Sequence, residues 1–340
     1  MFPVLIDKLQ RRVDLTVDEA AAAMGTIMDG QAQPSQMAGF LVGLAMKGER
    51  PAEIVGLART MRARAVKLSR PYDPVFDTCG TGGDGAHTFN VSTVAALVLA
   101  ACGVRVAKHG NRSASSRCGS ADLFETLGVN IAAAPDVAER CLEDAGIAFL
   151  FAQTFHPSMK HAAQTRRDLG VRTAFNLLGP LTNPAGAKRQ LVGVARPELT
   201  ELVARSLAQL GAERAWVVHG ADGLDEISTT GYTKVSECRD GAVNTFYLHP
   251  GDVGLGKTAP STLTGGDAAR NADIARAVLA GADGPARDIV LLNAGASLLI
   301  AGRACTVPEG IAMAAEAIDS GRAVEVLERL IRISNDGQAA

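Results

Sequence analysis

The feature that most constrains this fold is a change of sequence pattern at a turn-rich stretch, residues 69–74. Before it, apolar residues recur only at helical spacing, in segments that open at Thr16, Pro34 and Pro51. After it, short apolar runs alternate with helical patterns, which is typical of βαβ units around a mostly parallel sheet. The stretch is therefore the expected boundary between two domains.

Apolar runs in the second part predict five strands, at 75–77, 104–108, 147–151, 190–194 and 214–219. Two further runs predict an antiparallel pair added to that sheet, at 234–238 and 245–248, joined by a loop at 239–244. Helical periods follow at 267–279, 289–301, 308–318 and 322–333. We expect an α/β fold with a small N-terminal helical domain and a large α/β domain whose mostly parallel central sheet is flanked by helices. The expected domains are 1–70, with a helical contribution from about 156–185, and 75–335.

Composition excludes several classes of protein. The chain has 340 residues, of which 47% are hydrophobic, so it lies outside the range of disordered chains. Its 34 basic and 36 acidic residues leave a net charge of −2, too balanced to bind nucleic acid by bulk charge. The longest apolar run, 94–101, is far below the roughly 20 residues that span a bilayer. The start shows no export signal, and six cysteines without a C-x-x-C pair predict reduced thiols. We therefore expect a cytoplasmic protein that binds neither membrane nor nucleic acid.

The first expected strand is followed by a glycine-rich loop, residues 77–85, of sequence DTCGTGGDG. The loop leads to a helix that begins within residues 90–93, NVST. Glycines let backbone N–H groups approach an anion closely, and the free N–H groups and dipole of a helix N-terminus favour phosphate. The loop therefore predicts a phosphate site, with a tight surface turn as the alternative.

Two nucleotide-binding motifs match the sequence only in part, one in the glycine-rich loop and one at residues 256–258. Positions 80, 82 and 85 match the dinucleotide fingerprint, but four residues separate Gly85 from Asn90, and the next strand ends in Lys108 rather than an acid. A phosphate-loop triphosphatase pattern at 256–258 is followed by Pro260 instead of an apolar helix.

Two more loops at expected strand ends carry charged side chains. Residues 108–112, KHGNR, offer cationic donors for phosphate or carboxylate, with a solvated basic loop as the alternative. Asp222, Asp225 and Glu226 suit Mg²⁺, which binds through one or two carboxylates plus substrate phosphates, although a helix-capping turn is also consistent with them. Because they follow strands, these loops should face the same crevice as the glycines.

A helix expected from about 158 to 169 carries two adjacent arginines, Arg166 and Arg167. Neighbouring side chains on a helix are rotated by about 100°, so one should point inward, but periodicity does not choose between them. A buried arginine would bind a planar carboxylate in bidentate fashion, whereas an exposed, ion-paired arginine is the commoner case.

Together with His156-Pro157 and the segment 172–180, RTAFNLLGP, these motifs resemble in order and spacing those of the anthranilate phosphoribosyltransferase family. The resemblance extends over essentially the whole chain. It implies a homodimer of the nucleoside-phosphorylase-like type with its active site between the two domains. It also implies transfer of the 5-phosphoribosyl group of 5-phosphoribosyl diphosphate to the amino group of anthranilate, in L-tryptophan biosynthesis, with up to two Mg²⁺ ions.

The resemblance further implies residue roles, and it selects Arg166 over Arg167. The residues expected to be catalytic are Lys108, Asp84 and Asn90. Those expected to bind 5-phosphoribosyl diphosphate are Gly80, Thr81, Gly82, Gly83, Asp84, Thr88, Asn90, Ser92, Thr93, Lys108 and Ser120. Those expected along the anthranilate route are Gly80, His109, Asn111, Arg166 and Pro180. The expected metal ligands are Ser92, Asp225 and Glu226.

Two other functions stay open at this point. A pyrimidine-nucleoside phosphorylase would share the fold and run a related displacement with phosphate. A non-catalytic relative that binds nucleic acid would need a basic face, for which the charge balance gives little support.

Overall fold

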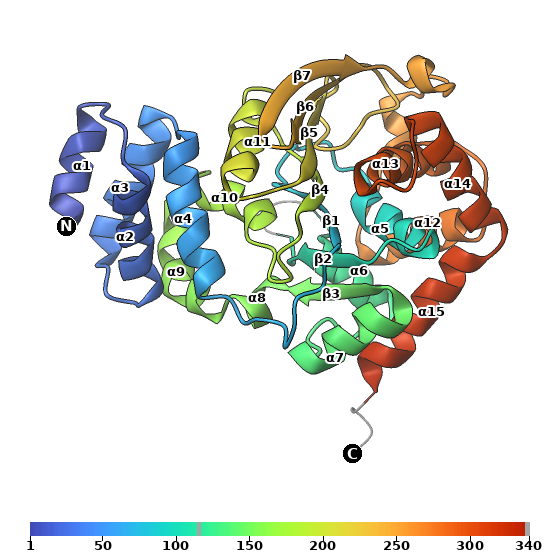
Figure 1. Cartoon of the computed structure of the whole chain (residues 1–340), viewed down its shortest axis with the longest axis horizontal. Helices are drawn as coiled ribbons and strands as arrows, with labels where there is room; N and C mark the ends of the chain where they lie inside the picture. Colours follow the sequence, from blue (N-terminus) through green and yellow to red (C-terminus); the bar gives the residue numbers. More distant parts are fainter. Residues whose placement is uncertain (114–116, 337–340) are drawn as a thin grey trace.

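The computed structural model describes residues 1–113 and 117–336. Its N-terminal part consists of four helices, shown in blue in Figure 1: α1 (Phe2–Gln10), α2 (Val17–Met28), α3 (Pro34–Lys47) and α4 (Pro51–Ala63). The expected capping box is present, because the Thr16 hydroxyl accepts the N–H of Glu19 at 3.2 Å. The sequence pattern had not singled out α1, a short helix whose Phe2, Leu5 and Leu9 are buried.

A later segment of the chain packs onto these helices. Helix α9 (Lys160–Leu169) contacts α2 and α3, and α10 (Phe175–Leu178) contacts α4 (Figure 1). This arrangement is consistent with the expected helical contribution from 156–185. The domain boundaries themselves stay a prediction.

The rest of the chain is built on one seven-stranded sheet of order β3-β2-β1-β4-β5-β6-β7. The first five strands in this order are parallel, and the last two pair antiparallel. The predicted fold class, a small helical part plus an α/β domain with a mostly parallel sheet, is therefore confirmed. The strands are β1 (Phe76–Gly80), β2 (Val106–Gly110), β3 (Ile147–Phe151), β4 (Arg189–Gly193), β5 (Arg214–Gly220), β6 (Thr233–Arg239) and β7 (Ala242–Leu248).

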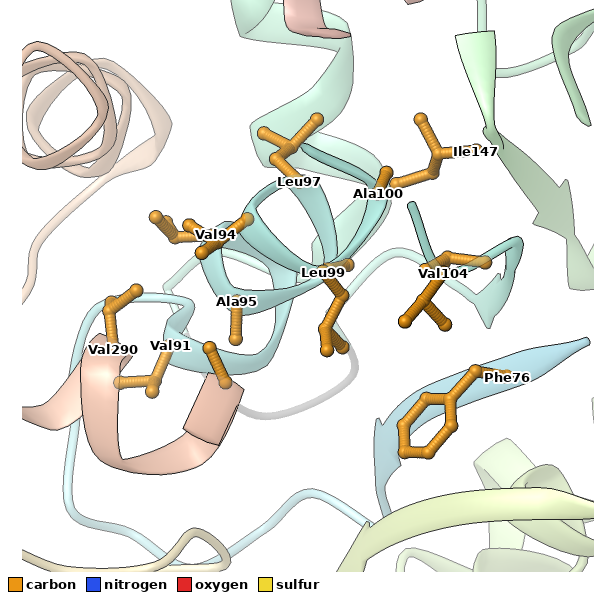
Figure 2. Packing of buried hydrophobic residues seen from close by; sticks show 14 of the residues in the cluster. Phe76, Val91, Val94, Ala95, Leu97, Leu99, Ala100, Val104, Ile147 and Val290 are labelled. Carbon is orange, nitrogen blue, oxygen red and sulfur yellow. The ribbon is translucent and has the colours of Figure 1, made fainter. Parts of the chain in front are cut away.

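Helices cover this sheet, and α5 (Val91–Ala101) is the most deeply buried of those near the glycine loop. Its residues 91–100 are nearly all buried, and Figure 2 shows them packed between Phe76 of β1, Ile147 of β3 and Val290 of α13. The other helices of this part are α6 (Ser120–Leu127), α7 (Pro135–Arg140), α8 (Ala152–Phe155), α11 (Leu199–Gln209), α12 (Ala268–Leu279), α13 (Pro285–Ala301), α14 (Val307–Asp319) and α15 (Arg322–Asn335). Short 3₁₀ or π turns are η1 (Cys141–Ala145), η2 (Pro157–Met159), η3 (Gly179–Leu181), η4 (Pro250–Val253) and η5 (Pro260–Leu263). No helix within the described residues is long and apolar enough to cross a membrane.

The structure corrects the expected loop between the antiparallel strands. Strands β6 and β7 continue to the pair Arg239 and Ala242, so a two-residue turn, Asp240-Gly241, replaces a loop at 239–244. Both turn residues have positive φ, +49° and +82°, as the tight hairpin turns that match strand twist require. The polar Asn244 and Thr245 interrupt the apolar residues of β7, so the expected strand began only at residue 245.

Candidate active site

The glycine-rich loop begins where β1 ends and is fastened to the neighbouring strand β4. The N–H of Thr81 donates to the carbonyl of Gly193 at 2.9 Å, and the Thr81 hydroxyl accepts the N–H of Ala195 at 3.3 Å. Gly82 and Gly83 follow with φ of +62° and +75°, a left-handed conformation that residues with a Cβ rarely adopt. The predicted loop is therefore held in a shape that requires its glycines.

Two carboxylates are tied to the segments predicted to bind phosphate. The Asp225 Oδ2 atom accepts the N–H of Gly82 at 3.0 Å, and Glu226 Oε1 accepts the N–H of Ser92 at 3.1 Å. Burial raises the pKa of both acids; Asp84 adds to the rise in the pKa of Asp225, and Asp225 adds to that of Glu226. Negative charge is thus concentrated between the glycine loop and α5, where a cation would relieve it.

The third acid of that loop has a different role. Asp222 Oδ2 accepts the hydroxyls of Ser228, at 2.7 Å, and Thr230, and Asp222 Oδ1 accepts the N–H of Leu224 at 3.3 Å. These bonds occupy its carboxylate inside the turn. Of the three acids that suited Mg²⁺ in the sequence, Asp225 is bonded to the glycine loop and Glu226 to the start of α5, whereas Asp222 is bonded within its own turn.

A lysine lies beneath the N-terminus of α5. Lys108 is only 2% exposed, and its Nζ atom donates to the carbonyl of Thr78 and lies 3.5 Å from the Ser92 hydroxyl. Burial lowers the pKa of Lys108, and the negative charge of Asp77 opposes this effect. The cation, the hydroxyl and the helix N-terminus together form a region suited to an anionic oxygen.

A buried network that sequence reasoning missed holds this strand end in place. Asp77 is fully buried; it accepts the backbone N–H of His109 at 3.2 Å and the Nδ2 of Asn183 at 2.8 Å. Burial raises the pKa of Asp77 to about 6, although the positive charge of Lys108 opposes the rise. The sequence did contain one signal for the role of Asp77, because an acid inside an apolar strand is expected to be buried and to need polar partners. Nothing in the pattern pointed to Asn183, which comes from a distant loop.

His109 packs beside the segment that contains Pro180. Its Nδ1 atom lies 3.0 Å from the carbonyl of Gly179, and Pro180 is buried next to it. The His109 and His156 rings lie 5.1 Å apart. Burial lowers the pKa of His109 to about 3 and that of His156 to about 4, so both rings are neutral at physiological pH.

The structure distinguishes the two adjacent arginines. Arg167 is exposed and donates to Gln164 at 2.6 Å, whereas Arg166 is half-buried and lies over the ring of Phe175 at 5.0 Å. Burial lowers the pKa of Arg166, and no acid of the described residues compensates it. Arg166 is thus a desolvated cation that a ligand carboxylate could pair with.

Two residues of the predicted basic loop behave differently from each other. Arg112 forms ion pairs with Asp122 at 3.0 Å and Glu125 at 2.7 Å, so its guanidinium is already paired within the protein. Asn111 is exposed, and its carbonyl accepts the N–H of Ala121 at 3.2 Å, which positions it at the start of α6.

The remaining predicted residues lie around the N-terminus of α5. Asn90 donates from Nδ2 to the carbonyl of Cys118 and accepts from Asn271, both at 3.0 Å. Thr88 forms an isolated bridge with Thr264. Thr93 is fully buried, and its hydroxyl has no partner among the described residues.

The acidic groups do not form a complete metal site by themselves. Among the residues that the structure describes, no group of three or more His, Cys, Asp or Glu side chains could hold a metal ion. Asp225 and Glu226 supply two carboxylates, which fits Mg²⁺ because that ion keeps several waters and takes further oxygens from substrate phosphates. The structure therefore brings the glycine loop, α5, Lys108 and these acids together, while the binding role of each residue stays a prediction.

Residues 72–324 match the family described as the a/b domain of the glycosyl transferase family, and residues 3–65 match its helical bundle domain. An anthranilate phosphoribosyltransferase of Moorella thermoacetica is 54% identical over 97% of this chain and 98% of its own.

Solved structures agree over nearly the full length. Anthranilate phosphoribosyltransferase of Thermus thermophilus superposes with a TM-score of 0.90 at 45% identity, covering 97% of this chain and 99% of its own. The Saccharomyces cerevisiae enzyme, in complex with 5-phosphoribosyl diphosphate and Mg, has a TM-score of 0.89 at 29% identity and covers 98% of both chains. On this full-length similarity in both sequence and fold, the chain belongs to the anthranilate phosphoribosyltransferases, within the glycosyl transferase family.

Proposed function

We propose that this chain transfers the 5-phosphoribosyl group of 5-phosphoribosyl diphosphate to the amino group of anthranilate, giving N-(5-phosphoribosyl)anthranilate and diphosphate in L-tryptophan biosynthesis. The observation that carries the proposal is the convergence, at one edge of the sheet, of the glycine loop, the N-terminus of α5, Lys108 and the Asp225–Glu226 pair. Together they match the charges of a metal-bound diphosphate.

The ribosyl donor would bind along the glycine loop and the start of α5. The loop offers backbone N–H groups, and Lys108 offers a buried cation within 3.5 Å of the Ser92 hydroxyl. The unpartnered hydroxyl of Thr93 is a further polar group at the same helix end. The proposed donor site comprises Gly80, Thr81, Gly82, Gly83, Asp84, Thr88, Asn90, Ser92, Thr93, Lys108 and Ser120.

Asp225, Glu226 and Ser92 would hold Mg²⁺, with up to two ions. The clustering of acids that raises the pKa of Asp225 and Glu226 supports this assignment, because a divalent cation would favour their charged forms. When bound, the metal would supply charge neutralisation for the departing diphosphate.

Anthranilate would approach from the side of the helical part. Arg166 is the residue proposed to face its carboxylate, because it is half-buried and only desolvation acts on its pKa. The remaining residues proposed along this route are Gly80, His109, Asn111 and Pro180. A neutral His109 suits contact with an aromatic ring better than a charged one would.

The chemistry needs positioning and charge stabilisation more than proton transfer. Departure of diphosphate develops positive charge at ribose C1 and negative charge on the leaving group, which Lys108 and the N–H groups of α5 would stabilise. The amine of anthranilate is neutral at pH 7, so no strong general base is required at the start, and we assign none. Asp84 and Asn90 would orient the donor, and closure of the helical part over the sheet would exclude water as a competing nucleophile.

We extend the proposal to assembly and location by analogy with the family. The chain would act as a homodimer in the cytoplasm. Size-exclusion chromatography with light scattering would test the dimer directly.

The decisive experiment follows the fluorescence of anthranilate with purified protein, 5-phosphoribosyl diphosphate and Mg²⁺, omitting the donor or the metal in the controls. Signal loss that needs every component supports the transferase. A steady signal from folded protein contradicts it, and cleavage of uridine or thymidine with phosphate alone would then identify a nucleoside phosphorylase.

A further inference from the structure

A cavity of about 340 Å³ lies at the edge of the sheet opposite the candidate active site. Its wall includes the starts of β1 and β4, the turn before β2 and the end of α13. These segments lie at the amino ends of the parallel strands, whereas the glycine loop follows a carboxyl end. The cavity is therefore separate from the candidate active site, and its volume falls within the range of small-molecule sites.

Three arginines contribute to the wall. Arg189, at the start of β4, is fixed by Glu213, at 3.2 Å, and by the carbonyl of Ala301, to which it donates at 2.6 Å. Arg105 and Arg303 are exposed, and neither forms a side-chain hydrogen bond or ion pair within the described part of the chain. Two guanidinium groups are thus available to a ligand.

The acidic side chain in the wall, Glu143, offsets their positive charge only in part, because Arg105 is one of several groups that lower its pKa. Glu143 is engaged by Arg70 through an ion pair and by the Tyr72 hydroxyl, which donates to it at 2.7 Å. The Tyr72 ring also supports Arg105, whose Cζ lies 5.9 Å from the ring centroid. The cavity therefore keeps an excess of positive charge.

The ends of α5 and α13 also reach the cavity, and the partial negative charge of helix C-termini opposes an anion there. Their exposed carbonyls already have donors: the carbonyl of Ala100 accepts the N–H of Gly103 at 2.9 Å, and Ala301 accepts Arg189. An anionic group would therefore bind at the arginines rather than at the helix ends. The Arg303 guanidinium lies over Gly103, 3.4 Å from where a Cβ would be.

The rest of the wall is apolar. Val75, Phe76, Val104 and Leu142 line it, and Figure 2 shows Val104 next to Phe76, between the end of α5 and β1. These four side chains are at most 8% exposed and form the floor of the cavity, whereas Pro74 and Ala301, which also line it, keep apolar surface open to water. An organic anion would cover that surface, and an inorganic anion would not.

We infer that this cavity is a second ligand site, for a small organic carboxylate whose anionic group pairs with Arg105 and Arg303 while its apolar body packs on Pro74, Ala301 and the edge of Val104. Arg189 closes the inner end of the site and is held in place without the ligand. The planar guanidinium group of an arginine matches the geometry of a carboxylate, so Arg105 and Arg303 favour a carboxylate as the anionic group of the ligand.

Isothermal titration calorimetry with 3-phenylpropionate tests the site. The full chain carries Arg166→Gln, so that a carboxylate does not bind at the candidate active site. Arg105→Gln and Arg303→Gln are then added, singly and together. The matched control is Arg329→Gln, an exposed arginine on α15.

We expect one 3-phenylpropionate per chain, bound at least about tenfold more weakly by the double variant, with the single variants between and Arg329→Gln unchanged. The neutral 3-phenylpropanol and inorganic phosphate should each bind at least about tenfold more weakly than the carboxylate. Any of three results overturns the inference. They are no binding of 3-phenylpropionate at about 10 mM, an unchanged Kd in the double variant Arg105→Gln/Arg303→Gln, and phosphate binding as tight as that of the carboxylate. Because Arg105 and Arg303 are exposed, thermal unfolding should confirm that the variants fold.

Discussion

Replacing Gly193 by alanine should damage the candidate active site through the backbone of Asp225. Gly193 is the last residue of β4, and a Cβ built on it would lie 1.5 Å from the carbonyl oxygen of Asp225 and 2.5 Å from the carbonyl carbon. Ordinary contact begins at 3.4 Å, so the oxygen would have to retreat by 1.9 Å. Because the clash involves the backbone atoms of Asp225, it cannot be relieved by rotation of a side chain.

That displacement exceeds what the surrounding bonds tolerate. The Asp225 carboxylate accepts the N–H of Gly82 at 3.0 Å, and a retreat of this size would break the bond and move a proposed metal ligand. Overpacking of this kind costs about 1–3 kcal/mol of unfolding free energy. A misplacement near 1 Å costs about a hundredfold in rate, so kcat should fall by at least that factor.

Alanine variants of two further glycines distinguish an effect on unfolding from an effect on Mg²⁺ binding. Gly80→Ala would place its Cβ 2.5 Å from Asp225 Oδ2, the tip of a side chain that can rotate away, so unfolding should change little while Mg²⁺ binds more weakly. Gly231→Ala, in the same region of the chain, meets nothing within 4 Å and should match the wild type.

Urea unfolding and a Mg²⁺ titration of transferase activity measure these effects for all three variants. The expected order of damage to activity is Gly193→Ala, then Gly80→Ala, then Gly231→Ala. If Gly193→Ala keeps both the wild-type unfolding midpoint and the wild-type Mg²⁺ dependence, the contact between β4 and Asp225 does not position the site, and the reasoning fails.

Three other substitutions or titrations test separate parts of the site. Arg166→Ala should raise the KM for anthranilate by about tenfold or more with little change in the KM for the ribosyl donor, since it removes one charged hydrogen-bond partner; steady-state kinetics giving equal changes would count against it. The double variant Asp225→Asn/Glu226→Gln should need much more Mg²⁺ for half-maximal rate, and an unchanged titration would remove both acids from the metal site. His109 and His156 should stay neutral down to pH 5, because burial lowers their pKa values to about 3 and about 4. The unfolded chain, with pKa values near the ordinary 6.5, then binds more protons, so stability should decrease as pH falls from about 6.5 toward 4. Imidazole NMR titrations and urea unfolding check this, and a midpoint above pH 5 for either ring would contradict it.

The sequence carried enough information to predict the layered architecture. Short runs of three to six residues alternating with helical periods indicate a parallel sheet covered by helices, because that arrangement buries both faces of the sheet and the apolar face of each helix. It did not predict the two-residue turn at Asp240-Gly241, since the polar Asn244 and Thr245 interrupt the apolar residues of the edge strand beyond it. Helix α1 lies in the part expected to be helical but was not singled out: its buried Phe2, Leu5 and Leu9 do recur at helical spacing, but the helix is short and packs against α3.

The site was predictable where function depends on local chemistry and not where it depends on distant contacts. Strand ends and glycines predicted that the glycine loop and Lys108 lie at the same edge of the sheet, and the structure has both there. Long-range pairing decided the rest. Asp222 turned inward to its own loop, and Asn183 reached Asp77 from more than 100 positions away, which no spacing rule reveals.

The candidate site departs from the usual rules for buried charge, and the departures share one cause. Arg166 is desolvated without an acid, and Asp225 and Glu226 are crowded acids whose pKa values are raised. Hydrophobic residues at these positions would often make a folded protein more stable, since charges left unpaired in low dielectric are costly. Under the proposed function, each departure would be removed by a ligand of opposite charge: a carboxylate for Arg166 and a divalent cation for the acids. The unfavourable electrostatics of the protein alone would then become favourable terms of substrate and metal binding. This supports the roles that the family resemblance gives these residues, whereas Arg112, which is already paired with Asp122 and Glu125, has no such need of a ligand.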